Sequence, residues 1–386
     1  MPTYHLQFEN PAQPSFRAAQ VAGMFGLEDP SGSRFELQAE LPSLDEAWQI
    51  GAIVGPSGSG KTSLALAAFG SAGMSEPEWP RDRAVVDAFP ESLPMRRIVE
   101  AFGAVGFHTP PAWLRPYRLL SQGEQFRCRL ALALLRAGES SCSETPLLVC
   151  DEFTSAIDRD TARSASFALA RAIRSGQIRA RLVAISCHSD VLPWLAPDWS
   201  LDLASNQLTR GLLRRPSLTL EVARVRAALW SHFRRHHYLA SSLNPAVQAF
   251  AAFRDDRPIA FSAWMRMGAA GHQRRDVRLA YREHRTVVLP EFQGLGIGNR
   301  LSEWCASLFR GLGHRAYSAT SHPAMIGHRL RSPSWRKVRL GFGRSSHPPR
   351  SRSRSQPNLA ALRWKGSFEY IGPALDRADA ARLMVR

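Results

Sequence analysis

Lysine is nearly absent from this chain of 386 residues: Lys61, Lys337 and Lys365 are its three lysines, among 50 basic residues in all. Cysteine is also scarce. The five cysteines are odd in number and show neither a CxxC pair nor the Cys/His spacing of a zinc site. This pattern argues against a disulfide framework and against structural zinc, and it favours a reducing cytoplasm.

Long apolar runs are missing as well. No stretch approaches the roughly 18–20 uninterrupted apolar residues of a membrane span. The first residues, MPTYHLQFENPAQPS, lack the basic and apolar regions of a secretory signal. The composition, 44% hydrophobic and 22% charged, is that of an ordinary globular protein. We therefore expect a cytoplasmic protein without a membrane partner.

The length exceeds one ordinary hydrophobic core and predicts two domains. The net charge of +17 is divided unevenly along the chain: residues 1–210 carry −4, and residues 211–386 carry +21. A strongly basic second part predicts nucleic acid as a partner or acceptor. The alternative is that an arginine-rich proteome makes any exposed face basic.

Short apolar runs alternate with helical patterns in the first part. Residues 50–54, 147–150 and 181–186 have the pattern of buried strands, and residues 122–137 and 160–175 that of helices. This alternation predicts a layered α/β domain with a largely parallel sheet. It spans residues 1–208, and the basic stretch 209–216 is the predicted linker.

The second part, residues 217–386, has a different order of elements. We expect a strand at 217–222, a helix ending near His236 and a hairpin that turns at 254–257. A long strand at 277–289 and a helix after Gln293 follow. Residues 343–357 (GRSSHPPRSRSRSQP) form a low-complexity basic loop.

A glycine-rich motif follows the first predicted strand. The residues GPSGSGKT match GxxxxGK[ST] between a strand and a helix, which is the context that a phosphate-binding loop requires. Backbone amides would hold the phosphates of ATP, Lys61 would bridge the β- and γ-phosphates, and Thr62 would ligate Mg²⁺. A glycine-rich surface turn, the alternative, would not need lysine in a lysine-poor chain. The predicted ATP-binding residues are Gly55, Ser57, Gly58, Ser59, Gly60, Lys61, Thr62 and Ser63.

The run LLVCDE supplies two carboxylates at the end of a second strand. Asp151 would ligate the metal, and Glu152 would orient or deprotonate the attacking water. A strand that merely ends in an acidic turn is the alternative. The phosphate-binding loop in the same domain makes that alternative improbable.

Leu120–Gln125 (LSQGEQ) resembles the LSGGQ signature of ABC-type ATPases. Ser155–Asp158 stands at the place of that family's D-loop, and His188 at the place of its γ-phosphate-sensing histidine. The resemblance covers residues 15–208 and implies an ATP-dependent homodimer that sandwiches two ATP molecules. In such a dimer the signature of one chain contacts the nucleotide of the other. The signature residues assigned to ATP are Ser121, Gly123 and Glu124.

Three departures from the ABC pattern stand out. The Q-loop glutamine is not evident, and Val85–Phe89 occupies its place. Phe25 could stack on adenine, but Phe16 and Phe35 are rivals, and core packing is the alternative for all three. Few residues separate Asp87 from the signature, which disfavours a transporter subunit.

Val287–Leu301 (VVLPEFQGLGIGNRL) resembles motif A of GNAT acyltransferases, in which a strand and a glycine-rich turn precede a helix. The resemblance covers residues 217–375 and implies an α+β domain with a mixed sheet that binds acetyl-CoA. The overall fold class is thus α/β, a P-loop ABC-type ATPase domain followed by this GNAT domain. The assigned residues are Val287, Leu289, Gln293, Gly294, Leu295, Gly296, Ile297 and Gly298.

The acyl-transfer residues are less defined. Glu283 lies where several GNAT proteins place a catalytic carboxylate, and a salt-bridged face is the equal alternative. Tyr238, after His236 and His237, lies where the family often binds the acceptor, and a half-buried helix end is the alternative there. Residues 320–328 contain no tyrosine to act as the acid. Ser321, His322, Tyr317 or water would have to protonate the thiolate.

Two functions follow from these motifs. The first is an enzyme with Glu152, His188, Glu283 and Tyr238 as catalytic residues and ATP, Mg²⁺ and acetyl-CoA as cofactors. In that enzyme, ATP binding and hydrolysis gate acyl transfer to an acceptor such as tRNA or DNA. The second is an ATP-switched binding or defence module whose GNAT fold is catalytically weak.

Overall fold

The computed structural model describes residues 1–9, 15–26, 34–70, 78–139, 145–211, 218–237, 242–267, 279–344 and 362–385. The chain divides into two compact units. The first contains Met1–Glu78, Leu132–Asp158 and Leu169–Pro216, and the second contains Trp79–Ala131, Arg159–Ala168 and Ser217–Arg386. The second unit thus includes two segments that the sequence assigns to the ATPase domain.

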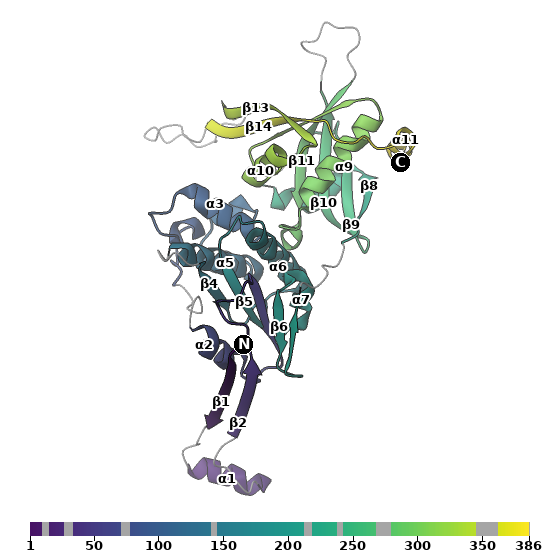
Figure 1. Cartoon of the computed structure of the whole chain (residues 1–386). Coiled ribbons are helices and arrows are strands. Elements are labelled where there is room, and N and C mark those ends of the chain that lie inside the picture. Colours follow the sequence, from purple (N-terminus) through teal and green to yellow (C-terminus); the bar gives the residue numbers. More distant parts are fainter. Residues whose placement is uncertain are drawn as a thin grey trace. The chain divides into compact units, whose positions relative to one another are not determined.

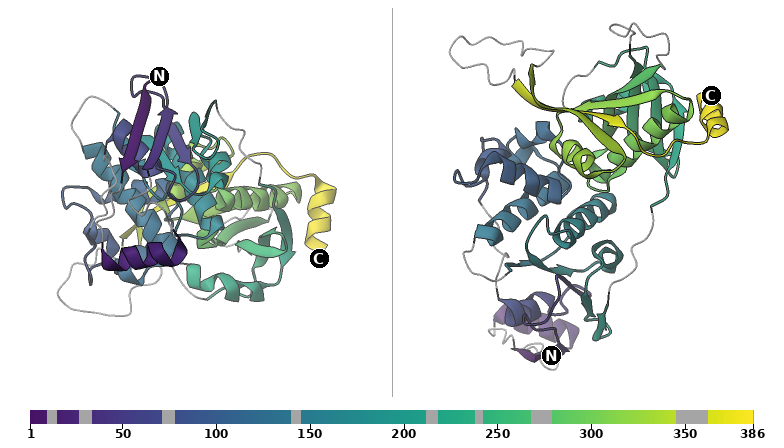
Figure 2. Two further views of the ribbon diagram at one scale, coloured as in Figure 1. Left: turned by 90° about the horizontal axis from the view of Figure 1, so that it is seen from below. Right: turned by 45° about the horizontal axis from the view of Figure 1, so that its top comes forward.

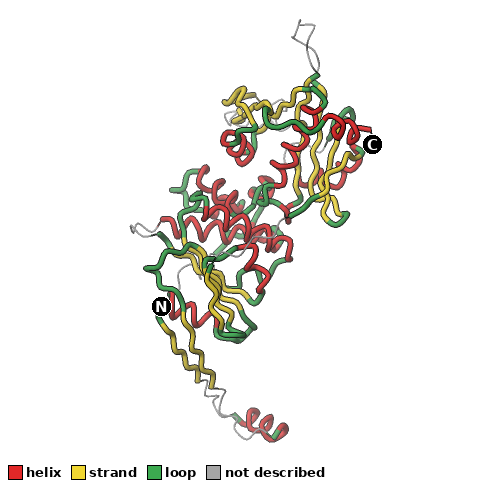
Figure 3. Tube along the Cα trace, turned by 45° about the vertical axis from the view of Figure 1, so that its right-hand side comes forward, coloured by secondary structure: helices red, strands yellow, loops and turns green. Residues whose placement is uncertain are grey.

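The first unit contains a five-stranded sheet, whose strands run side by side as one layer in Figure 3. Four strands are parallel, and the edge strand β7 is antiparallel. In spatial order they are β4 (Leu147–Cys150), β5 (Arg181–Ser186), β3 (Ile50–Val54), β6 (Trp199–Asp202) and β7 (Gln207–Arg210). All of β3 is buried, as its unbroken apolar run predicted. The three predicted strands are confirmed.

Helix α2 (Lys61–Phe69) starts directly after the loop that follows β3. The predicted helices at 122–137 and 160–175 are confirmed as α5 (Gln122–Glu139) and α6 (Arg159–Arg174). The boundary between the units falls within both of them. A 3₁₀ turn, η3 (Ser189–Val191), and α7 (Leu192–Leu195) connect β5 to β6.

A two-stranded ribbon extends the first unit. β1 (Thr3–Glu9) and β2 (Arg34–Glu40) pair antiparallel, and α1 (Phe16–Phe25) lies beyond their ends (Figure 1). Ser15 caps α1 by accepting a hydrogen bond from the Ala18 amide at 3.1 Å. Phe16 and Phe25 on this helix are 79% and 74% exposed, so neither contributes to the core.

The second unit contains a seven-stranded sheet in which only β11 and β12 are parallel. In spatial order the strands are β13 (Trp335–Arg344), β14 (Leu362–Tyr370), β12 (Arg315–Thr320), β11 (Ala280–Val288), β10 (Arg257–Arg266), β9 (Gln248–Arg254) and β8 (Glu221–Val225). The predicted hairpin is confirmed: Asp255 and Asp256 form the turn between β9 and β10 with positive φ.

Helix α9 (Ile297–Gly311) packs against β10, β11 and β12. Helix α10 (Pro323–Arg331) packs on β13 and β14, and the C-terminal α11 (Arg377–Val385) lies next to α9 and β8 (Figure 2). The remaining elements of this unit are short: η1 (Val85–Ala88), α3 (Met95–Ala104), α4 (Pro110–Trp113), η2 (Tyr117–Leu119) and η6 (Pro290–Phe292).

Some predicted boundaries differ from the structure. The strand predicted at 217–222 is found at Glu221–Val225. The helix near His236 is a series of short turns, η4 (Ala227–Leu229), α8 (Trp230–Phe233) and η5 (Arg234–His236). The predicted linker begins inside β7, and its residues 212–216 lie outside the described residues. Of the basic loop, 343–344 end β13, and 345–357 lie outside the described residues.

Strand β3 is tightly packed in the core of the first unit. A Cβ added to Gly51 would lie 2.1 Å from the nearest ring atom of Trp199, which also packs on Trp48 and Phe69. We predict that Gly51→Ala lowers the free energy of unfolding by about 1–3 kcal/mol, because the ring has to move. Urea unfolding of the full chain, followed by tryptophan fluorescence, measures this change.

Gly23→Ala is the matched control. Gly23 lies inside α1, and nothing lies within 4 Å of an added Cβ. Alanine should therefore stabilise the helix by about 0.5–1 kcal/mol. Equal effects of the two substitutions would contradict the packing argument.

Candidate functional site

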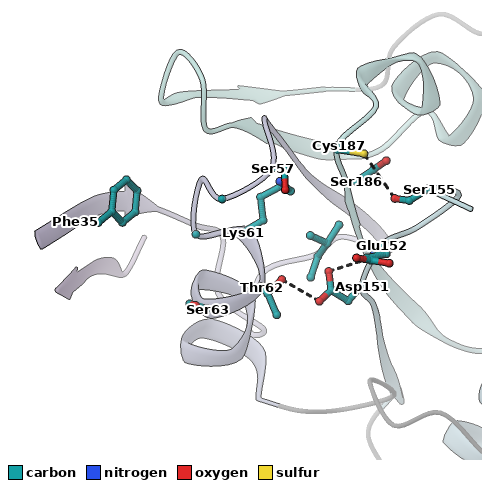
Figure 4. A pocket seen from close by; sticks show the side chains of 13 residues that line it. Phe35, Ser57, Lys61, Thr62, Ser63, Asp151, Glu152, Ser155, Ser186 and Cys187 are labelled. Atoms are coloured by element: carbon teal, nitrogen blue, oxygen red, sulfur yellow. Dashed lines mark hydrogen bonds between the residues drawn. The ribbon is translucent and has the colours of Figure 1, made fainter. Parts of the chain in front are cut away.

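The carboxyl ends of three parallel strands meet at one edge of the first sheet. Val54 of β3 is level with Ser186 of β5, and Cys150 of β4 is level with Ala184. Ligands bind at this edge in open α/β sheets. A pocket of about 490 Å³ opens there (Figure 4) and is lined by Phe35, Ser57, Gly58, Gly60, Lys61, Thr62, Ser63, Asp151, Glu152, Ser155, Ile185, Ser186 and Cys187.

The loop between β3 and α2 forms one wall of this pocket. Gly60 ends the loop at φ +82°, in the left-handed region, and its Cβ would lie 3.2 Å from the Phe35 ring. No side chain caps α2, and its first helical hydrogen bond is that from the Leu64 amide to the Gly60 carbonyl at 2.9 Å. The amides of Lys61, Thr62 and Ser63 therefore have no acceptor within the helix and can bind an anion.

The Lys61 ammonium lies inside the same loop. Its Nζ donates to the carbonyl oxygens of Gly55 at 2.9 Å and Pro56 at 2.5 Å. These neutral acceptors hold the cation at the place where phosphate oxygens would approach the loop amides. The lysine and the amides together fit a polyphosphate.

A hydroxyl and a carboxylate are hydrogen-bonded to each other in the pocket. Thr62 Oγ1 donates to Asp151 Oδ2 at 2.9 Å, and Asp151 Oδ1 accepts from the Glu152 amide at 2.8 Å (Figure 4). Mg²⁺ takes few protein ligands and prefers oxygen. Within the described ranges no three His, Cys, Asp or Glu side chains gather as a metal site. The pair Thr62 and Asp151 therefore fits Mg²⁺ that is held mainly by phosphate and water.

The backbone after β4 is bent into a rare conformation. Glu152 and Thr154 have φ of +47° and +66°, which costs a non-glycine residue about 1–3 kcal/mol. The buried Phe153 between them holds the turn, because its amide donates to the Ile185 carbonyl at 2.7 Å. The turn keeps Glu152 on the pocket wall.

Most of the predicted ATP-binding residues line the pocket, with two exceptions. Gly55 and Ser59 belong to the loop without lining it, and the Ser59 hydroxyl donates to the Pro56 carbonyl at 2.9 Å. His188 is exposed at the start of η3 and is also not among the lining residues. Its amide donates to Ser186 Oγ at 3.1 Å.

The sequence interpretation gave Cys187 no role at the nucleotide, and it gave Ser155 only a place in the predicted D-loop. Cys187 and Ser155 lie 3.7 Å apart, Sγ to Oγ, on the wall opposite Lys61 (Figure 4). Of the three candidate phenylalanines, Phe35 lines the pocket. The position of Cys187 directly after a parallel strand was the available signal for it.

The signature residues belong to the second unit. Glu124 Oε2 accepts from the Ser121 amide at 2.9 Å and from its hydroxyl at 3.1 Å, while Ser121 Oγ accepts from the Glu124 amide at 3.3 Å. This reciprocal arrangement is a capping box at the start of α5. A Cβ on Gly123 would lie 2.8 Å from Thr161 of α6, so glycine allows close packing there.

The glycine-rich turn of the second unit has a similar design to the first. Gly296 precedes α9 at φ +81° without a side-chain cap, and the first helical hydrogen bond joins the Arg300 amide to the Gly296 carbonyl. The amides of Ile297 and Gly298 therefore have no helical acceptor. A Cβ on Gly298 would lie 3.2 Å from Val288, so α9 starts close to β11. This turn fits a pyrophosphate.

Strands β11 and β12 separate next to this turn. They pair only over Ala280–Arg282 and Arg315–Tyr317, and β11 continues beyond to Val288. The Leu289 amide donates to the Ile259 carbonyl at 3.0 Å, so it faces β10. In antiparallel pairing every second residue faces the other edge. The open edge therefore presents the backbone of Thr286 and Val288, one residue from the predicted Val287 and Leu289, although the Val288 carbonyl already accepts from Gln293 Nε2 at 3.0 Å.

Glu283 lies in a buried polar cluster. Its carboxylate pairs with the Arg329 guanidinium at 2.8 Å and accepts hydrogen bonds from Ser318 and Thr286. Glu283 and Arg329 are 8% and 1% exposed, and Arg329 also lies 4.7 Å from the centroid of the Trp335 ring. Glu283 thus takes part in a salt bridge, which was the alternative to a catalytic role, and its partner Arg329 belongs to α10. Removing either charge would leave the other buried and uncompensated.

The other acyl-transfer candidates have different environments. Burial lowers the pKa of His322, so its imidazole is neutral at pH 7. Burial also raises the pKa of Tyr317, whose hydroxyl donates to Glu369 at 3.5 Å, so it stays protonated at neutral pH. Tyr238 lies outside the described residues.

Known proteins resemble this chain only in part. No family model matches it, and no curated protein matches it in sequence. Among solved structures, it is similar to the IAA acetyltransferase of Bacillus cereus, with 12% identity, 39% of this chain and 99% of that chain covered, and a TM-score of 0.29.

Two further solved structures resemble parts of the chain. A dimeric bacterial ABC transporter cassette has 15% identity, 44% and 87% coverage of the two chains and a TM-score of 0.30. Arabidopsis thaliana NAA60 in complex with acetyl-CoA has 14% identity, 39% and 98% coverage and a TM-score of 0.31. Acetyltransferases and ABC cassettes are thus both among the structural neighbours. TM-scores this low carry no argument, so the proposals below rest on the sites themselves.

The basic loop and the lack of long apolar runs can be compared with the structure only over the described residues. Most of the basic loop lies outside the described residues, so nucleic-acid binding stays a prediction. Throughout the described ranges, no helix combines the length and the apolar character needed to cross a bilayer.

The lowered pKa values of two histidines in the second unit imply that the stability of the fold depends on pH. Burial, reinforced by Arg285, lowers the pKa of His237 to about 3 and that of His284 to about 4, from an ordinary 6.5. Below pH 6.5 the unfolded chain binds protons that the folded chain resists. Stability is therefore fully present above about pH 6.5 and is lost as the pH falls toward the folded values.

We predict that the free energy of unfolding falls between pH 7.5 and pH 5, and that H237Q/H284Q reduces this fall. Urea unfolding at several pH values measures the slope. At pH 7.5 both imidazoles are neutral, so the variant measured there controls for lost packing. An unchanged slope in the variant would contradict the assignment.

Proposed function

We propose that the chain is a non-transporter ATPase of the ABC type joined to a GNAT-type acyltransferase, residues 1–208 and 217–386, in which ATP gates acyl transfer. The observation that carries this proposal is the single pocket that contains Lys61, Thr62, Asp151 and Glu152. A glycine-rich turn, a lysine, a metal-ligand pair and a carboxylate are the parts that phosphoryl transfer to water needs.

Each residue of the ATP site has a stated task. The loop amides and Lys61 would hold the phosphates, and Thr62 with Asp151 would hold Mg²⁺, which would supply positive charge to the phosphate oxygens. Glu152 orients the water and accepts its proton. His188 and the signature residues Ser121 and Gly123 contact the γ-phosphate in an assembled dimer, and Glu124 orients Ser121 for this contact through the capping box.

The acyl site uses backbone groups more than side chains. The amides at the start of α9 hold the pyrophosphate of acetyl-CoA, and the open edge of β11 holds the pantetheine chain. The attacking group of the acceptor loses a proton as it adds to the thioester carbonyl, and the CoA thiolate takes up a proton as it leaves. Because Glu283 is ion-paired with Arg329, its work as the base requires that pair to open. Tyr238 is proposed to contact the acceptor.

A second candidate is an ATP-switched module that binds acyl-CoA without transferring the acyl group. The hydrogen-bonded Glu283 carboxylate favours it, since a base needs a free lone pair directed at the acceptor. Acetyl-CoA binding without thioester loss, tested against tRNA, DNA, proteins and small amines, would select this candidate. The basic second part makes nucleic acid the first acceptor to test.

Separate substitutions test the two sites. We predict that Lys61→Ala lowers ATP hydrolysis by about 10²-fold or more, because the phosphates lose their cation. Gly296→Glu should abolish acetyl-CoA binding, since it adds a carboxylate and a Cβ at a position with φ of +81°. Phosphate release and calorimetric titration with acetyl-CoA measure the two effects.

Gly313→Glu is the matched control for Gly296→Glu. Gly313 has the same φ of +81°, with nothing within 4 Å of an added Cβ, and it lies outside the turn before α9. It should retain acetyl-CoA binding. A wild-type protein that neither hydrolyses ATP nor binds acetyl-CoA would refute the proposal.

ATP-dependent dimerisation is the next prediction. Glu152→Gln keeps the size of the side chain but cannot accept a proton, so ATP should stay bound and hold two chains together. Size-exclusion chromatography with light scattering should show a dimer in saturating Mg-ATP and a monomer without nucleotide. The double variant K61A/E152Q is the control and should stay monomeric. A monomeric Glu152→Gln protein in Mg-ATP would count against an ABC-type site.

A further inference from the structure

Arg127 joins three segments of the second unit. This residue of α5 is 2% exposed. Its Nη1 donates to the carbonyl oxygens of Gly106 at 3.3 Å and Pro290 at 2.8 Å, and its Nη2 donates to Ser164 Oγ of α6 at 2.6 Å. Pro290 begins the turn that leads into Gln293. The signature helix is therefore hydrogen-bonded to the start of the acyl-CoA loop, here defined as residues 290–298.

Gln293 makes a second connection and is 9% exposed. Its Oε1 accepts from the His108 amide at 3.1 Å and from Thr109 Oγ1 at 3.2 Å, while its Nε2 donates to the Val288 carbonyl at 3.0 Å. One amide group thus connects the start of α4 with the last residue of β11. It stands three residues before Gly296, where the unsatisfied amides begin.

Close packing supports these hydrogen bonds. A Cβ added to Gly294 would lie 2.8 Å from the Ala168 Cβ and 3.0 Å from the Gly106 Cα. The acyl-CoA loop therefore touches α6 and the segment after α3 with no room for a larger residue. All of these residues belong to the second compact unit.

Asp160, near the start of α6, makes a third connection. Its Oδ1 accepts from Arg254 at the end of β9 at 2.6 Å and from Arg163 at 3.0 Å. The Phe292 ring of the acyl-CoA loop lies 5.6–6.0 Å from the guanidinium groups of Arg163, Arg254 and Arg257. Helix α6 begins directly after the predicted D-loop, and α5 begins within the predicted signature. Both motifs are therefore next in sequence to a helix that makes one of these connections.

We propose that these contacts are a joint that couples the ATP site to the acyl-CoA site, with Arg127 as its positioning residue. The proposal rests on the function proposed above and adds the route by which ATP acts on acyl-CoA. Hydrogen bonds of 2.6–3.3 Å weaken steeply when their atoms separate, and a buried guanidinium without acceptors is costly. When α5 shifts in an ATP-bound dimer, the acyl-CoA loop shifts with it.

Coupling of this kind is reciprocal. If ATP changes the dissociation constant of acetyl-CoA by some factor, acetyl-CoA must change that of ATP by the same factor. Typical couplings are about 5–150-fold, and we expect about tenfold here. The test uses the full chain carrying Glu152→Gln, so that ATP is not consumed. Calorimetry measures each ligand with and without saturation by the other.

Two variants in this background remove parts of the joint without substituting a residue of either ligand site. Arg127→Met removes the hydrogen bonds to Pro290 and Ser164, and Thr109→Val removes one donor to Gln293 while keeping the side-chain shape. For each ligand alone, the dissociation constant should be within twofold of that of the Glu152→Gln protein, which is the parent of both variants. The coupling factor should fall to nearly one in Arg127→Met and at least twofold in Thr109→Val. Arg136→Met, an exposed arginine of the same helix, is the matched control and should keep the full factor.

The outcomes separate this proposal from the proposed function. Binding of both ligands with a coupling factor of one in the parent would overturn the joint and leave the two sites standing. Failure of either ligand to bind would overturn the proposed function and the joint with it. Full coupling in both joint variants would refute the assigned route. If Arg127→Met does not fold, Thr109→Val decides alone, and an unchanged factor in it overturns the proposal.

Discussion

The backbone amides at the start of α2 and α9 have no carbonyl acceptor in their own helices, and this constraint shapes both candidate sites. In each case a strand ends, a short turn follows, and a glycine with φ near +80° begins the helix without a side-chain cap. A capping serine or aspartate would have satisfied one of these amides internally. Glycine leaves them available to an anion, and the helix dipole favours negative charge there.

The two sites differ in what surrounds this common feature. At the ATP site, parallel register brings charged side chains from the ends of β3 and β4 into one pocket. At the acyl-CoA site, the separation of β11 from β12 leaves backbone groups open, and the nearest carboxylate, Glu283, is committed to Arg329. The pocket of the first unit therefore gathers charged side chains, whereas the glycine-rich turn and open strand edge of the second unit present mainly backbone groups.

Buried charge is concentrated in the second unit. Arg127 and Arg329 are almost fully buried. Arg127 donates to acceptors from three segments, and Arg329 donates through Nη2 to Glu283 and Ser302. Such groups add little net stability compared with apolar packing, but losing one partner leaves an uncompensated buried charge, which is strongly destabilising. This property suits Arg127 to the coupling proposed above, and it gives Glu283 a structural role as the partner of Arg329.

The sequence by itself determined the strands at 50–54, 147–150 and 181–186, the helices α5 and α6, and the hairpin at Asp255, because these depend on local periodicity and turn residues. It also identified Lys61 with Thr62, and Asp151 with Glu152, as candidate site residues, because each pair belongs to a short local motif. Only the tertiary structure decided that Phe35 and Cys187 line the pocket, that Thr286 and Val288 face the open edge, and that Glu283 pairs with Arg329. These results depend on strand register and on contacts between residues far apart in the chain, which no local pattern encodes.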